Sequence, residues 1–245
     1  MNIFETIRRL KEERPHLKDP LELYEKVLRF EERANSVLSE KKGEETLQII
    51  DAFTEVFSLP SEWGDLLKEK ISLKGKNPFE DPWCLLDLEL PYQEGHEEDL
   101  KRMLFILSKP FFKTLRLKSI REPFSESNRC PICGEYVSLS RIDFENKRYI
   151  VCPLCGYEGR TFRIGCMYCL KRSSEIIDLL VDEDEIRVEL CRECNSYSKS
   201  FREETYQKYG DPNLIDIISL PLEVVAQKRG FIRRSSNAIG VKVII

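Results

Sequence analysis

Four C-x-x-C pairs dominate the second half of this 245-residue sequence and include eight of its nine cysteines. Two thiolates separated by two residues can turn toward one point on a tight loop, so each pair supplies half of a tetrahedral Cys₄ site. We therefore expect two such sites, each holding one metal ion, and the ligand type suits iron and zinc equally. The pairs are Cys130/Cys133, Cys152/Cys155, Cys166/Cys169 and Cys191/Cys194.

The segments between the pairs indicate which halves share a site. A strand-like run, a polar turn and a second strand-like run separate Cys133 from Cys152, and the same plan separates Cys169 from Cys191. This repeat of knuckle, hairpin and knuckle is typical of zinc ribbons and rubredoxin-like modules. Sequential pairing is expected because each hairpin brings its own two knuckles together. The crossed pairing of a RING-type brace is the alternative. The strand-like runs are 136–142, 147–151, 175–181 and 185–190.

Paired cysteines also occur in disulfide frameworks and in thioredoxin-type redox sites. The N-terminal segment lacks the apolar run of a secretory signal, which argues against a disulfide framework. A redox pair requires a βαβ setting, and the flanking residues do not indicate one. The ninth cysteine, Cys84, lies in an apolar run and is predicted to be a buried structural thiol.

Helical periodicity predicts an N-terminal α-helical domain over residues 1–125. A connection over 74–92 should be extended and should bury Phe79 and Trp83. His16 and His96 are predicted to be surface residues. No phosphate loop or nucleophile motif is visible in this half, so we expect a protein that is not an enzyme. Helices are expected from Asp19 as N-cap, over 44–57, from Ser61 to Ile71, over 97–107 ending before Pro110, and briefly before Arg121.

The rest of the chain should give an α+β protein: tandem rubredoxin-like or zinc-ribbon Cys₄ modules over 126–200, then a helical tail over 201–245 packed on them. The boundary is expected at 122–129. In the tail, Asp211 and Pro212 begin a helix that Pro221 should kink and that Gly230 should end. The last residues, 241–245, could form a docked strand. A local positive patch is predicted from Lys228, Arg229, Arg233 and Arg234.

Charge and hydropathy narrow the classes of partner. Residues 126–200 hold more Asp and Glu than Lys and Arg, and thiolate ligation would add further negative charge. A nucleic-acid ribbon needs a basic face, so this balance argues against nucleic acid as the main partner. No stretch approaches the roughly 20 apolar residues of a membrane-spanning helix. We expect a cytoplasmic protein that does not enter a membrane.

The order of motifs resembles one family, the formate dehydrogenase accessory (formation) proteins, FdhE. The likeness begins with Cys-Pro-x-Cys-Gly at Cys130 and an Arg-Tyr-x-x-Cys entry at Arg148, and it continues through Cys-x-x-Cys-x-x-Tyr-x-Lys over 191–199. The sequence departs from the family pattern at Glu223, where Asp is commoner, and at Ala238, where Pro is frequent. The helical domain is also shorter than usual. Further tail matches are Asp216, Ser219, Leu220, Leu222, Gly230, Phe231 and Asn237.

The resemblance implies an assembly and maturation factor that binds the catalytic subunit of formate dehydrogenase, with rubredoxin-like sites that hold iron and a tendency to form homodimers. Two other classes stay open: a zinc-ribbon nucleic-acid-binding protein and a rubredoxin-like electron carrier. The polar residues of the tail could instead cap helices and tie the tail onto the ribbons, which is the alternative to contact with a partner. Candidate partner-binding residues are Tyr197, Lys199, Asp216, Ser219, Gly230, Phe231 and Asn237.

Overall fold

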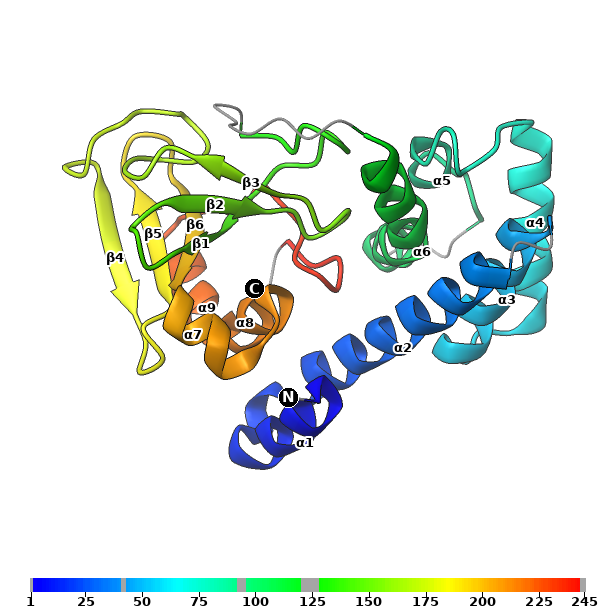
Figure 1. Cartoon of the computed structure of the whole chain (residues 1–245), viewed down its shortest axis with the longest axis horizontal. Helices are drawn as coiled ribbons and strands as arrows, with labels where there is room; N and C mark the ends of the chain where they lie inside the picture. The colour runs from blue at the N-terminus through cyan, green and yellow to red at the C-terminus, as the bar shows by residue number, and fades with distance from the viewer. Residues whose placement is uncertain (1, 41–42, 92–95, 120–127, 243–245) are drawn as a thin grey trace.

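A computed structural model describes residues 2–40, 43–91, 96–119 and 128–242, and shows the α+β architecture that the sequence predicts. A helical region lies at one side of the molecule and a six-stranded sheet at the other, with α6 beside the sheet and the C-terminal helices below it (Figure 1). None of the described helices is long and apolar enough to cross a membrane.

The helical region is built on the long helix α2, which begins at Lys18. Its buried side chains recur every three or four residues from Leu21 to Ala34, so one stripe of the helix faces the core. Asp19 is the second residue of this helix and not its N-cap, because a 3-10 turn over Pro15–Leu17 leads directly into it. The helices are α1 (Ile3–Glu13), α2 (Lys18–Glu40), α3 (Glu45–Phe57), α4 (Ser61–Lys74), α5 (Trp83–Leu86) and α6 (Glu97–Lys118).

Two further predictions for this region are wrong. Helix α6 continues through Pro110, because the residues around it are buried on every side and their packing outweighs the cost of a proline, about 3 kcal/mol. The connection before α6 is not fully extended, since it contains the short helix α5, which begins at Trp83. Trp83 is also 39% exposed and not buried as predicted. The Trp83 indole N–H donates to the backbone carbonyl of Cys133 at 3.0 Å, so the helical region contacts the first knuckle directly.

The sheet has the strand order β3-β2-β1-β6-β5-β4. Each predicted hairpin is present as an antiparallel pair, and a parallel pairing of β1 with β6, with Leu139 opposite Lys199, joins the two ribbons into one sheet. Strands β3 and β6 lie outside the four strand-like runs that were predicted from the sequence. The strands are β1 (Leu139–Ile142), β2 (Arg148–Val151), β3 (Glu158–Thr161), β4 (Ile177–Val181), β5 (Arg187–Cys191) and β6 (Ser196–Arg202).

Three helices form the tail: α7 (Glu203–Tyr209), α8 (Pro212–Ile218) and α9 (Leu220–Lys228). The Asp211 carboxylate accepts from the Leu214 amide at 2.7 Å and caps α8, as predicted. Pro221 lies at the start of α9, where the helical tail divides in two, and Gly230 follows α9 with a φ of 85°. Residues 241 and 242 are not in a strand. Residues 122–127 of the boundary predicted at 122–129, and the last residues, 243–245, lie outside the described residues.

The helical region and the ribbons share one continuous hydrophobic core, which includes side chains from α2 and α6 and from the first Cys₄ group. Polar contacts add to it. The Tyr24 hydroxyl donates to the Asp211 carboxylate at 2.9 Å, and the Lys109 ammonium donates to the Ala238 carbonyl at 3.1 Å. The metal-binding part of the chain is therefore held firmly against the helices.

Candidate metal centres and the buried ion-pair network

The first centre consists of Cys130, Cys133, Cys152 and Cys155, from the knuckles that flank the β1–β2 hairpin. The Cys130 and Cys155 sulfurs are 3.5 Å apart, and the Cys133 and Cys152 sulfurs are 3.4 Å apart. Tetrahedral thiolate ligation at about 2.3 Å places sulfurs about 3.8 Å from one another, so the group fits one zinc or iron ion. All four cysteines are buried, at 0–3% exposure.

The second centre has the same plan around the β4–β5 hairpin and consists of Cys166, Cys169, Cys191 and Cys194. The Cys166 and Cys194 sulfurs are 3.5 Å apart, and the Cys169 and Cys191 sulfurs are 3.8 Å apart. These separations again fit a tetrahedral metal ion. The sequence-based prediction of two Cys₄ sites with sequential pairing is thus confirmed, and the crossed brace is wrong for this chain.

The four knuckles share a backbone feature that the C-x-x-C spacing alone does not reveal. The residue after the second cysteine of each pair has a positive φ: 74° at Gly134, 68° at Gly156, 62° at Leu170 and 50° at Asn195. Amides inside the knuckles point at sulfur, and the Tyr168 amide lies 3.3 Å from the Cys166 sulfur. Amide donors stabilise a thiolate, so the loops are built to hold anionic sulfur.

The two centres differ in their access to the surface. In the second centre Cys169 and Cys194 are partly exposed, whereas every ligand of the first is buried. A cavity of about 210 Å³ reaches these two cysteines, and its walls include the rings of Tyr136 and Tyr168 and the side chain of Arg234. The edge of the second centre is therefore open to a partner or small molecule, and the first centre is closed.

Two acids and two bases form a fully buried network between β6 and the tail helices. The Arg233 guanidinium donates to both oxygens of Asp216, at 2.9 and 2.7 Å, and to Glu223 at 2.7 Å. The Lys199 ammonium contacts Asp216 at 2.6 Å and also pairs with Glu223. The Tyr197 hydroxyl donates to Glu223 at 2.6 Å. Formal charge balances inside the network, which lowers the cost of burying four ions.

Electrostatics inside this network favour the charged forms. Burial raises the pKa of Asp216, but Arg233 and Lys199 outweigh burial and lower that pKa to about 2. The paired carboxylates of Asp216 and Glu223 hold the pKa of Arg233 well above its ordinary value, against the effect of burial. Asp216 and Arg233 are therefore ionised at neutral pH.

The network corrects one prediction, because Arg233 is not part of a surface patch. Its side chain is 1% exposed and is held by the acids of α8 and α9. Lys228, Arg229 and Arg234 are exposed, as predicted for the patch. The pattern that could have identified Arg233 as buried is the placement of Asp216 and Glu223 among apolar residues of the tail, since such acids require internal cations.

The candidate partner-binding residues fall into two sets. Tyr197, Lys199, Asp216, Ser219 and Asn237 are buried, at 0–1% exposure, whereas Gly230 is exposed and Phe231 half-buried. The Asn237 side-chain oxygen accepts from the amides of Ile239 and Val241, and the Ser219 hydroxyl accepts from Lys199. The five buried residues thus make internal contacts that tie the tail to the sheet, which was the alternative to partner contact. Gly230 and Phe231 lie where a partner could reach them.

A second buried ion pair, which the sequence analysis missed, lies on the opposite face of the sheet. The Arg148 guanidinium donates to the Glu189 carboxylate at 2.8 Å and to the Ser140 hydroxyl at 2.9 Å. The Ser200 hydroxyl donates to the other oxygen of Glu189 at 2.7 Å. Serines on the two central strands leave room for these long side chains to meet above the β1–β6 pairing. The sequence places an arginine four residues before both Cys152 and Cys191, at Arg148 and Arg187, but this repeat does not show that Arg148 reaches Glu189.

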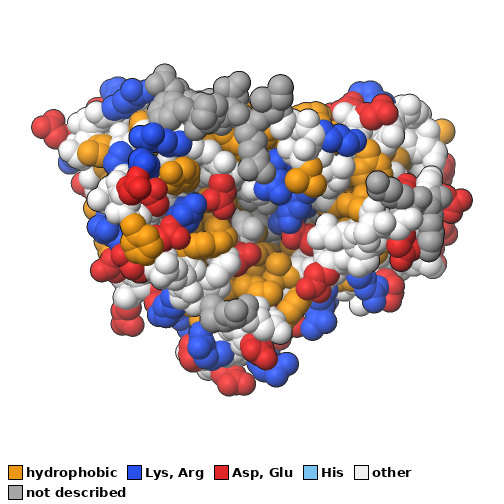
Figure 2. Space-filling model, viewed as in Figure 1, with side chains coloured by type: hydrophobic (Ala, Val, Ile, Leu, Met, Phe, Trp, Pro, Cys, Tyr) orange, Lys and Arg blue, Asp and Glu red, His pale blue; other side chains and the backbone are white. Residues whose placement is uncertain are grey.

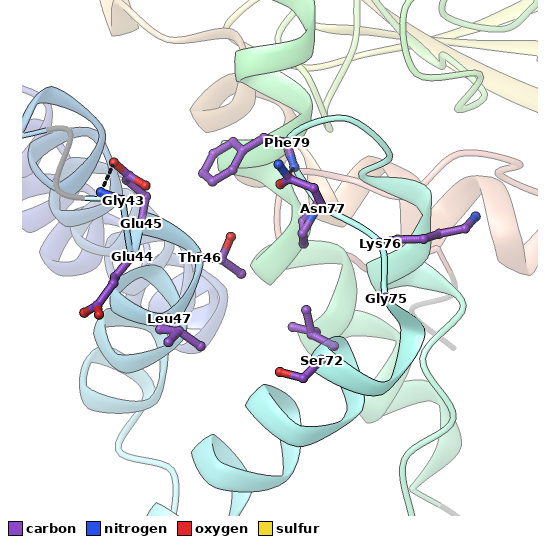
Figure 3. Close-up of a pocket in the computed structure, with 12 residues that line it drawn as sticks. Gly43, Glu44, Glu45, Thr46, Leu47, Ser72, Gly75, Lys76, Asn77 and Phe79 are labelled. Atoms are coloured by element: carbon purple, nitrogen blue, oxygen red, sulfur yellow. Dashed lines mark hydrogen bonds between the residues drawn. The ribbon is translucent and has the colours of Figure 1, made fainter.

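The helical region has a larger cavity of about 600 Å³ between the start of α3 and the end of α4 (Figure 3). Glu44 and Lys76 line its rim, and their charged ends point away from its centre in this view. Lys76 is paired with Asp81 at 2.5 Å, and Glu45 accepts from the Gly43 amide at 2.9 Å. Among the described residues that line this cavity, no set of charged or nucleophilic groups converges, so the lining does not resemble an active site.

The fold and the sulfur geometry define a class of protein: a helical region joined to a two-ribbon sheet that carries two Cys₄ metal centres. Residues 164–239, which contain the second centre and the ion-pair network, match the family model for the FdhE C-terminal domain. The FdhE protein from Pseudomonas aeruginosa has a similar crystal structure, with a TM-score of 0.65 and 22% identity over 96% of this chain and 93% of that one. That likeness shows the fold.

Two curated relatives named as FdhE homologues are similar in sequence. The protein from Aquifex aeolicus is 33% identical over 121 residues, 46% of this chain and 42% of its own length. The protein from Stutzerimonas stutzeri is 31% identical over 132 residues, 51% of this chain and 42% of its own length. The matched part thus spans less than half the length of these relatives. The chain is thus similar to FdhE proteins, and the resemblance drawn from its motifs is confirmed.

Proposed function

We propose that this chain is a maturation factor that binds the catalytic subunit of formate dehydrogenase in the cytoplasm and is needed for its activity. The observation that carries the proposal is the match of residues 164–239 to the FdhE C-terminal domain. The matched part contains four of the eight sulfur ligands and the whole Asp216, Glu223, Lys199 and Arg233 network.

The chemistry of the two centres supports a binding role over a catalytic one. A tetrahedral Cys₄ site leaves no coordination position for a substrate, so the metal ions stabilise the ribbons. Two small hairpins bury too little apolar surface to stay folded alone, and metal binding supplies the missing free energy. The shared core then fixes the ribbons against the helices, which gives a rigid surface for a client protein.

Deletion of the gene in its host tests this proposal. Formate dehydrogenase activity should fall strongly and should return with a plasmid copy, and a tagged copy should retain the catalytic subunit. Changing the exposed Gly230 to Asp and the half-buried Phe231 to Ala should together weaken retention while leaving two metal ions per chain. Full activity in the deletion strain, together with no retention of the catalytic subunit, would contradict the proposal.

A second candidate function is electron exchange with the client, and the partial exposure of Cys169 and Cys194 favours it. Iron in such a site supplies a one-electron couple, whereas zinc supplies none. Metal analysis of protein purified without added metal, followed by potentiometry, tests this function. Zinc in both centres would exclude it and leave the binding role intact.

Nucleic-acid binding receives less support. Lys and Arg side chains alternate with Asp and Glu over the face shown in Figure 2, without a continuous basic surface on that face. Salt-dependent retention on a DNA or RNA column is the measurement that would bring this class back.

A further inference from the structure

Two arginines near the second ribbon lack the partners that buried or half-buried cations usually have. Arg163 lies in the loop after β3, and Arg187 begins β5; both are half-buried. Among the described residues, neither guanidinium has a hydrogen-bond or ion-pair partner, and the Arg187 Nε is buried. Native proteins rarely leave a buried donor unpaired, so these two side chains call for an explanation.

Both arginines line one cavity of about 150 Å³ on the face of the sheet that holds the Arg148–Glu189 pair. The walls also include Gly165, Ser174 and Leu179. A single water needs roughly 10–15 Å³, so the cavity has room for a polyatomic ion. The lining residues come from β2, β4, β5 and the loop after β3, so both ribbons contribute to the site.

Charge in this cavity is unbalanced. Three guanidinium groups, Arg148, Arg163 and Arg187, surround one carboxylate, Glu189, which leaves an excess of two positive charges. Glu189 is already held by Arg148 and by Ser200, so it does not neutralise the other two arginines. Burial and the neighbouring cations, Arg148 first among them, lower the pKa of Arg163, as expected where like charges gather.

We propose that this cavity binds a dianionic tetrahedral oxyanion, a phosphate group, between Arg163 and Arg187. Guanidinium groups match the geometry of phosphate oxygens and can donate two hydrogen bonds each. The buried Arg148–Glu189 pair forms the floor, and the apolar side chains of Ile164 and Leu179 lie at the rim, 54% and 53% exposed. None of the eight cysteine ligands lines the site, and the site is independent of the proposed role in formate dehydrogenase maturation.

Isothermal titration of the metal-replete chain with inorganic phosphate at low ionic strength tests the proposal. Binding should saturate at one phosphate per chain and should be competed by sulfate. Arg163→Gln and Arg187→Gln should each weaken binding roughly 10- to 100-fold, the loss expected for hydrogen bonds to a charged group. The matched control is Arg160→Gln, which removes the same charge from an exposed arginine of β3 on the other face and should leave binding unchanged.

Two outcomes would overturn the proposal: no saturable binding, or equal weakening by Arg160→Gln and Arg163→Gln, which would indicate only nonspecific attraction. Metal content and circular dichroism check that each variant is folded. If Arg187→Gln loses its metal ions, the loop variant Arg163→Gln decides alone. Titration with phenyl phosphate distinguishes an organic phosphate from the free ion as the ligand. Phenyl phosphate that binds more tightly than inorganic phosphate supports an organic phosphate whose substituent contacts Ile164 and Leu179. Weaker binding of phenyl phosphate supports the free ion.

Discussion

Replacing Asp216 with alanine should reveal how much of the fold depends on the buried network. The substitution removes two hydrogen bonds from Arg233, at 2.9 and 2.7 Å, and the 2.6 Å contact from Lys199. Glu223 alone then faces two buried cations, so one positive charge is left uncompensated. Breaking a buried ion pair in this way costs about 3–5 kcal/mol. Such a loss is a large fraction of the roughly 5–15 kcal/mol that stabilises a typical domain.

Urea unfolding of the metal-replete protein, followed by circular dichroism, measures this cost. Asp178→Ala is the control, because Asp178 is 53% exposed and its contact with Arg192 is 3.7 Å, so it should change stability by less than about 0.5 kcal/mol. Adding Arg233→Met to Asp216→Ala restores the charge balance, and the double variant should lose less than the sum of the two single ones. An Asp216→Ala protein within about 1 kcal/mol of the parent would refute the reasoning. Weakened client binding at unchanged stability would support direct contact instead.

Low pH should remove the stabilisation that the ionised Asp216 carboxylate provides. The Asp216 pKa is about 2 in the folded chain and has an ordinary value of 3.8. A lowered folded pKa means that the stabilisation is complete above about pH 4 and is lost as the pH falls toward 2; the difference corresponds to about 2 kcal/mol. The stability gap between the parent and Asp216→Ala should therefore narrow in acid, and a gap that stays constant down to pH 2 would show that the carboxylate charge is not its cause.

Three further predictions concern the metal centres and the second hairpin. Cys130→Ser with Cys133→Ser should reduce the metal content from two ions per chain to one, measured by plasma emission spectroscopy; retention of two would mean that the first centre is not a metal site. Leu170→Gly should raise stability by up to about 1 kcal/mol because it relieves a left-handed backbone, whereas Gly156→Ala should lower it, and a lower melting temperature for Leu170→Gly would contradict this. The Asp184 carboxyl accepts hydrogen bonds from two cations and a tyrosine hydroxyl, and these contacts together outweigh burial and lower its pKa to about 2. NMR titration should show this pKa, and a midpoint near 3.8 would mean that these contacts are absent in solution.

The sulfur ligands and the two hairpins could be predicted from sequence because their signals are local. Spacing within a knuckle fixes where two sulfurs point, and a turn such as 143–146 brings the next knuckle back to it. Strand β6 could not be found in the same way. In this strand serines alternate with Tyr197, Lys199 and Phe201. A lysine is expected to be solvent-exposed unless its acidic partners are known, and those of Lys199 lie on α8 and α9.

The errors in the helical half have the same origin. Pro110 is a valid signal for a helix end, but the burial of its neighbours on all sides makes the helix continue. Trp83 was expected in the core, and it lies at the surface of α5 because its indole N–H reaches the carbonyl of Cys133. In both cases a contact with a distant part of the chain outweighs the local preference, and one sequence alone does not show that contact.

The parallel pairing of β1 with β6 has a consequence for the order of events during synthesis. All eight sulfur ligands have left the ribosome once Cys194 emerges, yet the edge of β1 that will pair with β6 stays open until Arg202 follows. Metal loading can therefore precede completion of the sheet, and during that interval the first ribbon presents an unpaired strand. Such an edge can pair with the β6 of a neighbouring nascent chain, which would exchange identical strands between two copies. Prompt arrival of the last strand protects the half-built sheet from this misassembly.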